Sequence, residues 1–312
     1  MYYLCAMNTT NDSNSTQTLE TIKASFYLLD FLICSVFTFL ITQTVWSSTV
    51  LKNEVRYFFL CHHLVCLTLF FGLGTIFSYI RTFEVFAPVL VCWLLFAAQI
   101  TFGKAAQLTL AIMALNTCIA VCWPLKYLTF VHSIKSKLIL CLWIISLLDP
   151  VVSLFYEGIQ KGPQEIVRLD PTCPTTLSST LSRIAGVAFI LLLAIIILAS
   201  YIIMFREGKR AGHFTTSNCQ ARRTILIHGL QIALHMFPTL INISIGGTNK
   251  YIILHLTSFI IFSLAQCLSP VVYGLRCTEL RQKFIERQHC CGLCNIYSAE
   301  SYQMNTTSKT ED

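Results

Sequence analysis

Charged residues are scarce in this sequence, since Asp, Glu, Lys and Arg together make up only 12% of its 312 residues. So few charges do not describe a water-soluble surface, and 55% of the residues are hydrophobic, with a mean hydropathy of +0.65. The formal net charge of +7 is distributed between hydrophobic segments instead of forming one basic cluster, so we expect no nucleic-acid partner. The composition predicts a membrane protein.

The sequence also lacks the motifs that enzymes and metal centres commonly need. It has no HExxH segment, and it shows no nucleophile paired with a base and no pair of carboxylates suited to a cleft. We therefore predict that the chain is not an enzyme and that it needs no cofactor or metal. Its 15 cysteines are scattered and mostly lie within apolar runs, which excludes a disulfide scaffold.

Long apolar segments take up most of the chain. A bilayer core about 30 Å thick needs roughly 20 helical residues to cross it. Runs such as 188–203 are apolar without the alternation of barrel strands, which favours helices. The predicted fold is an all-α bundle of seven transmembrane helices without an internal repeat. The expected spans are 25–51, 57–80, 91–118, 138–156, 184–205, 224–245 and 251–275.

The loops indicate an orientation, because Lys and Arg in short loops resist translocation. Most of these residues fall in alternate loops and after the last span, so that face is predicted to be cytoplasmic. Glycosylation triplets begin at Asn8, Asn11 and Asn14, which places the N-terminus outside a plasma-membrane protein. Residues 1–24 are thus an extracellular glycosylated segment, 25–275 the seven-helix domain, and 276–312 an amphipathic helix and cytoplasmic tail.

Several motifs occur in the order found in one receptor family. Residues 113–127, MALNTCIAVCWPLKY, resemble the MAxDRYVAICxPLxY end of helix 3 in olfactory-type, rhodopsin-like G-protein-coupled receptors. Residues 269–276, SPVVYGLR, resemble the NPxxY end of helix 7. The start of helix 2 at 56–60, the Ser200–Tyr201 pair and the start of helix 6 at 221–228 are also similar to that family. Taken together, the motifs resemble fish-type odorant receptors over nearly the whole chain.

This resemblance implies a chemosensory receptor that binds a small molecule within its helix bundle and signals to a heterotrimeric G protein. It also implies a disulfide between Cys92, at the outer end of helix 3, and Cys173, in the following extracellular loop. The residues expected to act in activation and G-protein coupling are Asn116, Thr117, Cys118, Tyr201, Pro270 and Tyr273.

The chain departs from the family pattern at the coupling motif. Asn116-Thr117-Cys118 replaces the acidic-Arg-Tyr triplet, so the cation that the family uses at the G-protein interface is missing. An alternative is therefore a non-signalling or atypically coupled heptahelical protein that serves as a partner or trafficking factor. Leu67, Ala106 and Ser269 replace the polar residues of the family's sodium site, so we expect no such site.

Two ionisable residues within the spans need an explanation, because a charge near mid-membrane costs about 2.5 to 3.5 kcal/mol on insertion scales. Lys104 and Asp149 are expected at similar depths in neighbouring helices and would form an ion pair. Alternatively Lys104 anchors an anionic or carbonyl-bearing ligand, extends toward the interface, or loses its proton. The other residues expected to face a mainly apolar pocket are Gln99, Phe102, Gln107, His235 and Tyr251.

The segment after the last span is suited to the membrane surface. Residues 278–287 predict a short amphipathic helix lying along the lipid bilayer. Cys290, Cys291 and Cys294 follow it, an arrangement typical of S-palmitoylation. Zinc binding by these thiols and His289 is the competing interpretation, but four ligands within six residues would strain tetrahedral geometry.

Overall fold

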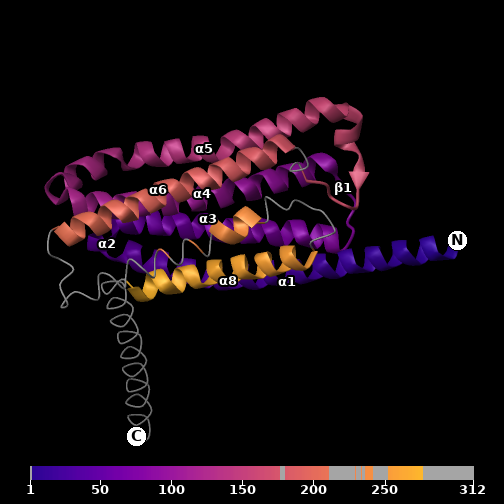
Figure 1. Cartoon of the computed structure of the whole chain (residues 1–312), viewed down its shortest axis with the longest axis horizontal. Coiled ribbons are helices and arrows are strands. Elements are labelled where there is room, and N and C mark those ends of the chain that lie inside the picture. The colour runs from indigo at the N-terminus through magenta and orange to yellow at the C-terminus, as the bar shows by residue number, and fades with distance from the viewer. Residues whose placement is uncertain are drawn as a thin grey trace, which may run out of the picture.

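The chain forms a bundle of long helices that lie side by side (Figure 1). The computed structural model describes residues 2–175, 180–210, 229, 233, 236–241 and 252–276. The helices are α1 (Tyr2–Ser47), α2 (Thr49–Asn53), α3 (Val55–Thr82), α4 (Val89–Cys122), α5 (Pro124–Val167), α6 (Thr180–Arg210) and α8 (Ile252–Arg276). Residues 236–241 are also helical.

Helix α4 has a central place in the packing. It contacts α3, α5 and α6, while α1 packs against both α3 and α8. Helix α4 is apolar along nearly its whole length, as expected for a helix that other helices and lipid surround. Its residues are therefore placed to border the interior of the bundle.

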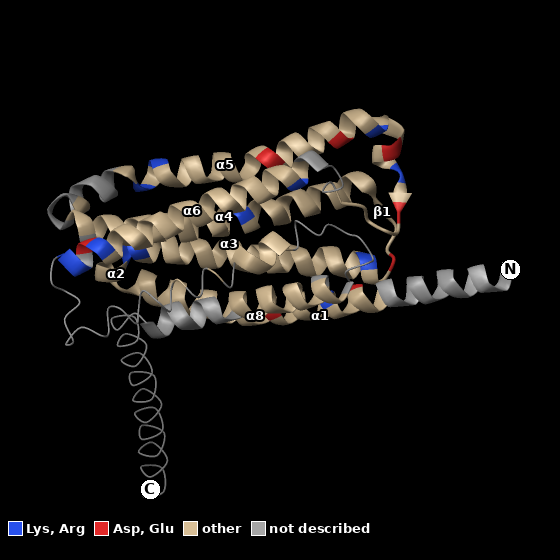
Figure 2. Ribbon diagram, in the orientation of Figure 1, with Lys and Arg blue, Asp and Glu red and all other residues tan. Residues whose placement is uncertain are grey.

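Five of the described helices are long and apolar enough to cross a membrane: Gln17–Ser47, Val55–Thr82, Val89–Ala120, Ile134–Val167 and Ser182–Glu207. Large apolar side chains such as Phe39 and Ile195 are nearly two-thirds exposed on the outer faces, which suits lipid surroundings. Charges gather near the two ends of the bundle and are sparse between them (Figure 2). The chain is a multi-pass membrane protein, as its composition predicts.

Four of the seven predicted spans lie wholly within helices of the structure. The spans at 57–80, 91–118, 138–156 and 184–205 fall inside α3, α4, α5 and α6. The first predicted span starts later than the apolar stretch of α1, which begins at Gln17. Most of the span at 224–245 lies outside the described residues, and the last corresponds to α8, which has a shorter apolar stretch at Leu256–Gln266.

One end of the bundle, here named the β1 end, carries a small antiparallel sheet. Strand β1 (Ala87–Pro88) pairs with β2 (Leu169–Asp170), with Ala87 opposite Asp170. Helix α5 breaks before it reaches β2, because Gly162 has a φ of 74°, a left-handed conformation that glycine adopts without a steric penalty. The sheet fixes the loop that follows α5 against the start of α4.

Candidate functional site

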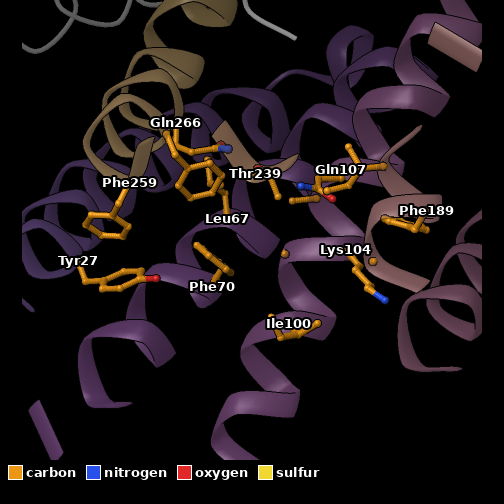
Figure 3. Close-up of a pocket in the computed structure, with 15 residues that line it drawn as sticks. Tyr27, Leu67, Phe70, Ile100, Lys104, Gln107, Phe189, Thr239, Phe259 and Gln266 are labelled. Carbon is orange, nitrogen blue, oxygen red and sulfur yellow. The ribbon is translucent and has the colours of Figure 1, made fainter. Parts of the chain in front are cut away.

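The bundle holds a partly open cavity of about 230 Å³ whose lining comes from α1, α3, α4, α6, α8 and the helical residues 236–241 (Figure 3). Leu67, Ile100 and Ile190 give it apolar walls, and Gln107, Thr239 and Gln266 are among its few polar groups. A mostly apolar cavity with a few converging polar groups has the chemistry of a small-molecule site.

Four aromatic rings form what we name the aromatic side of the cavity: Tyr27, Phe70, Phe259 and Phe262. The ring centroids of Tyr27 and Phe259 are 5.0 Å apart, and those of Phe70 and Phe262 are 5.9 Å apart. Tyr27 and Phe70, at 6.2 Å, connect the two pairs. These residues come from α1, α3 and α8, so rings distant in sequence converge on one part of the cavity.

The opposite side of the cavity holds Lys104 and Phe189 (Figure 3). The Lys104 ammonium forms an ion pair with the carboxylate of Asp149 and lies 5.1 Å from the centroid of the Phe189 ring. Both charged side chains are mostly buried, with 11% and 25% of their surfaces exposed. The predicted ion pair is therefore confirmed, and Lys104 also borders the cavity.

The other predicted ligand contacts divide into three groups. Gln107 lines the cavity and is buried. Gln99 and Phe102 are not among its lining residues: Gln99 lies behind Tyr27, and Phe102 packs edge-on against Trp143 of α5, at a centroid distance of 5.7 Å. Their predicted contact with a ligand stays a prediction, since both side chains pack against neighbouring helices in this structure. His235 and Tyr251 lie outside the described residues.

A close approach of three helices brings Gln99 against Tyr27. A Cβ atom added to Gly74 of α3 would lie 2.5 Å from Gln99 Nε2 and 2.7 Å from Tyr27 Cδ1. Real Cβ atoms do not come so near, so only glycine leaves room for these side chains. Gly74 thereby positions Tyr27 at the cavity.

Asp30 is a buried acid that the sequence interpretation passed over. It lies within the apolar stretch of α1, is 2% exposed, and accepts a hydrogen bond from the Ser263 hydroxyl of α8. The sequence does show this residue inside the first predicted span, 25–51, and acidic residues are rare within membrane spans. What the sequence does not reveal is that α1 and α8 pack together and bring Asp30 against Ser263.

The chain is similar over more than half of its length to odorant and olfactory receptors. The chain is 24% identical over 243 residues to "Odorant receptor 131-2" of Danio rerio, a match that covers 73% of each protein. It is 26% identical over 200 residues to "Putative olfactory receptor 1F12P" of Homo sapiens, a match that covers 58% of this chain and 57% of that protein. The chain is olfactory-receptor-like. No protein-family model matches it.

Both relatives are receptors and not enzymes, which confirms that this olfactory-receptor-like chain is not an enzyme. Its β1 end has the disulfide that the resemblance implies, since Cys92 of α4 is bonded to Cys173, 81 residues later. Both cysteines are fully buried beside Phe77 and Ala87. The bond ties the loop after α5 to the start of α4.

At the other end of α4, the olfactory-receptor-like chain has an uncharged coupling motif. The Tyr127 hydroxyl donates a hydrogen bond of 3.1 Å to Asn116 Oδ1. Thr117 is exposed and its hydroxyl donates to the Met113 carbonyl within the same helix, at 2.9 Å. Cys118 is buried, with its Sγ 3.9 Å from that of Cys122. Asn116 therefore links α4 to α5, while Thr117 presents no cation at the surface.

The remaining activation residues are only partly described. Tyr201 of α6 packs against the apolar cluster that includes Ala111 and Ile197. Pro270 and Tyr273 fall within α8, but their side chains are outside the described residues. The predicted meeting of the Tyr201 and Tyr273 phenols stays a prediction.

Two of the three positions of the family's sodium site, Leu67 and Ala106, are apolar in this olfactory-receptor-like chain. Leu67 is 2% exposed and packs with Cys34 and Phe71, and Ala106 is 1% exposed. Within the described part of the chain, no group of three or more His, Cys, Asp or Glu residues could hold a metal ion. The side chain of Ser269 lies beyond that part.

The predicted modification sites stay predictions. Asn8, Asn11 and Asn14 lie along the start of α1, where the structure describes the backbone alone. The amphipathic segment and the thiols proposed for acylation at Cys290, Cys291 and Cys294 lie outside the described residues.

Proposed function

We propose that this chain is a seven-helix chemosensory receptor of the plasma membrane that binds a small molecule in the cavity and signals to a heterotrimeric G protein. The observation that carries the proposal is the mainly apolar cavity inside the bundle, bordered by Lys104 and Gln107 of α4, in a chain similar to olfactory receptors. Such a cavity favours a small ligand with few polar groups.

The proposed seven helices and their orientation are supported by apolar segments, by the disulfide and by the positions of basic residues. Residues 224–245 are apolar enough for a further span, which joins the five candidate spans and α8. The Cys92–Cys173 bond favours an oxidising compartment, so the β1 end faces outward. The basic loops at the opposite end then face the cytoplasm, in agreement with the positive-inside rule. Glycans at the N-terminus and acyl chains at the tail belong to the same arrangement.

The sequence is unusual at position 117, which the resembling family uses in coupling to a G protein. The exposed Thr117 offers a hydroxyl that is already bonded within α4, where the resembling family has an arginine. We propose that the chain couples through the remaining cytoplasmic surface, with a lower efficiency than an arginine would give. A heptahelical partner without signalling is the alternative function, and Thr117 is the observation behind it.

The ligand site can be tested with a pair of neighbouring variants. Thr239 lines the cavity, whereas Phe237 is 65% exposed two residues away. In cells screened with odorants for a cAMP response and labelled at the surface, T239W should fill the cavity and abolish the response. F237W should respond like the wild type. An equal response of the two variants would place ligand binding elsewhere.

A further inference from the structure

One face of α4 lines the cavity, and Gln107 is the residue of that face nearest to Thr117. Four lining residues follow the three- and four-residue spacing of a helix face: Ile100, Gly103, Lys104 and Gln107. One turn further along α4, Ala111 packs with Leu193 and Met236 in an apolar cluster. We name the region next to this cluster the inner end of the cavity. Gln107 therefore lies at the inner end, where apolar side chains cover the helix beyond it.

The Gln107 side chain is a buried amide without a partner. The residue is 7% exposed, and within the described part of the chain its carboxamide takes part in no hydrogen bond. A carboxamide has two N–H donors and an oxygen that accepts, and a buried polar group that makes no hydrogen bond destabilises the fold. Packing alone does not explain this residue, because a leucine would fill similar space without that cost.

The other polar side chains of the cavity already interact with groups of the protein. They are Tyr27, Lys104, Thr239 and Gln266. Lys104 forms its ion pair with Asp149, and Tyr27 is hydrogen-bonded to the Gln99 side chain. Thr239 and Gln266 each have an interaction elsewhere in the chain. Of the described polar side chains that line the cavity, Gln107 alone has its whole hydrogen-bonding capacity left for a ligand.

The charges around the cavity favour a neutral ligand. Lys104 is the one charged side chain among the described lining residues, and its ion pair with Asp149 carries no net charge. Figure 3 shows the Lys104 nitrogen directed away from Gln107. A charged ligand would leave water for mainly apolar walls without a free opposite charge, which is costly. A neutral oxygen loses less hydration and regains it in one hydrogen bond.

The volume of the cavity limits the size of the ligand. A cavity of about 230 Å³ holds about eight non-hydrogen atoms, if each takes the roughly 30 Å³ that a water molecule occupies in the liquid. Most of the lining is apolar, with Ile100 on α4 and the rings of the aromatic side, so most of those atoms are expected to be carbon.

We propose that Gln107 determines the specificity of the cavity, which takes small neutral molecules with a single carbonyl or hydroxyl oxygen. That oxygen hydrogen-bonds to the Gln107 carboxamide at the inner end, and the hydrocarbon tail lies against Ile100 and the aromatic side. This inference rests on the proposed function, because it takes the cavity as the ligand site. It assigns the polar contact to Gln107 and not to Lys104.

The test uses two probes of one shape that differ in a single group. Heptan-2-one has a carbonyl where 2-methylhept-1-ene has a C=CH₂ group. Both would be titrated into full-length protein in lipid nanodiscs, with binding measured by calorimetry and the signal of empty nanodiscs subtracted. In Q107L the ratio of ketone to alkene affinity should fall at least about tenfold, because the ketone loses its hydrogen bond and the alkene loses nothing.

Two more variants complete this comparison. Q107M also removes the amide, so its ratio should fall as in Q107L. Q160L is the matched control, because Gln160 is exposed on α5 and bonds the Tyr156 hydroxyl outside the cavity. Its ratio should equal that of the wild type. Hexanoate and heptylamine test the charge preference, and each should bind wild-type protein at least about tenfold more weakly than heptan-2-one.

Thermal unfolding separates ligand recognition from a structural role. Without ligand, Q107L should melt at or above the temperature of the wild type, since it removes a buried amide that makes no hydrogen bond. Heptan-2-one should raise the melting temperature of the wild type more than that of Q107L. A lower melting temperature of both Q107L and Q107M, with the affinity ratio unchanged, would mean that the amide serves the fold and would overturn the proposal.

The other failures are distinguishable. Binding of hexanoate or heptylamine as tight as that of the ketone would overturn the preference for neutral ligands, and a lack of binding by every probe would overturn the inference as a whole. If T239W blocks heptan-2-one but Q107L and Q107M keep the wild-type ratio, the cavity remains the ligand site and only the role of Gln107 is lost. If T239W leaves binding of the ketone intact, the proposed ligand site itself fails.

Discussion

Lys104 of α4 and Asp149 of α5 form an ion pair inside the bundle, and the same lysine borders the cavity. One residue thus belongs both to the packing of two helices and to the wall of the proposed site. Because the pair joins neighbouring helices, its loss should first affect folding and then ligand response.

Breaking this ion pair from either side should reduce the amount of folded protein. K104M leaves a carboxylate without its cation, and D149N leaves a cation without its carboxylate, at a cost of about 3 kcal/mol for a buried pair. We expect surface labelling to fall in both single variants and to recover in the K104M/D149N double variant, which has neither charge. If D149N reaches the surface normally but K104M alone loses ligand response, the lysine acts mainly on the ligand.

Adding one methyl group at Gly74 should destabilise the protein. The new Cβ would approach the Gln99 amide and the Tyr27 ring at 2.5 and 2.7 Å, and such overpacking costs about 1 to 3 kcal/mol. We expect G74A to unfold at a lower temperature in detergent. G158A is the matched control, because its Cβ would meet only Ile166 Cδ1, at 3.8 Å. Equal melting temperatures of the two variants would contradict the close approach.

Removal of the disulfide should loosen the β1 end. The bond closes a long loop, and loss of such a bond costs about 2 to 5 kcal/mol in proteins that depend on it. C92S and C173S should each reduce surface labelling, and the double variant should be no worse than either single one. C141S provides the comparison, since Cys141 is an exposed free thiol. Additive losses in the double variant would mean that the two thiols act independently.

Introducing the missing cation should strengthen coupling. Thr117 is exposed at the end of α4 that is proposed to face the cytoplasm, so T117R can be accommodated without displacing a buried side chain. Ligand-dependent cAMP production should rise about tenfold at equal surface expression, because one charged contact to a partner contributes on the order of 1 kcal/mol or more. T117K gives a cation without the planar guanidinium and should restore less. An absence of any response in all three forms would favour the non-signalling alternative.

The sequence predicts some features of this protein because they depend on local or one-dimensional properties. The helices are predictable because an apolar run must be long enough to cross a bilayer. The pairing of Lys104 with Asp149 followed from their depths, which a constant rise per residue determines. The Cys92–Cys173 bond came from the family resemblance and not from spacing.

Other features depend on how whole helices are rotated and paired. Phe102 and Lys104 are two residues apart, yet one packs against Trp143 and the other borders the cavity. The aromatic side combines rings from α1, α3 and α8, and no local pattern indicates that these helices converge. Asp30 could have been noticed in the sequence, but its bond to Ser263 joins residues 233 positions apart.

Two interactions hold α4 near its ends. The disulfide between Cys92 and Cys173 lies at one end, and the hydrogen bond from Tyr127 to Asn116 lies near the other. The first interaction is a covalent bond, and the second is a single hydrogen bond between neutral groups. Among these two interactions, the one at the Cys92 end therefore resists displacement of α4 more strongly. If a ligand displaces α4, we therefore expect the larger movement at the Thr117 end, which is proposed to face the cytoplasm.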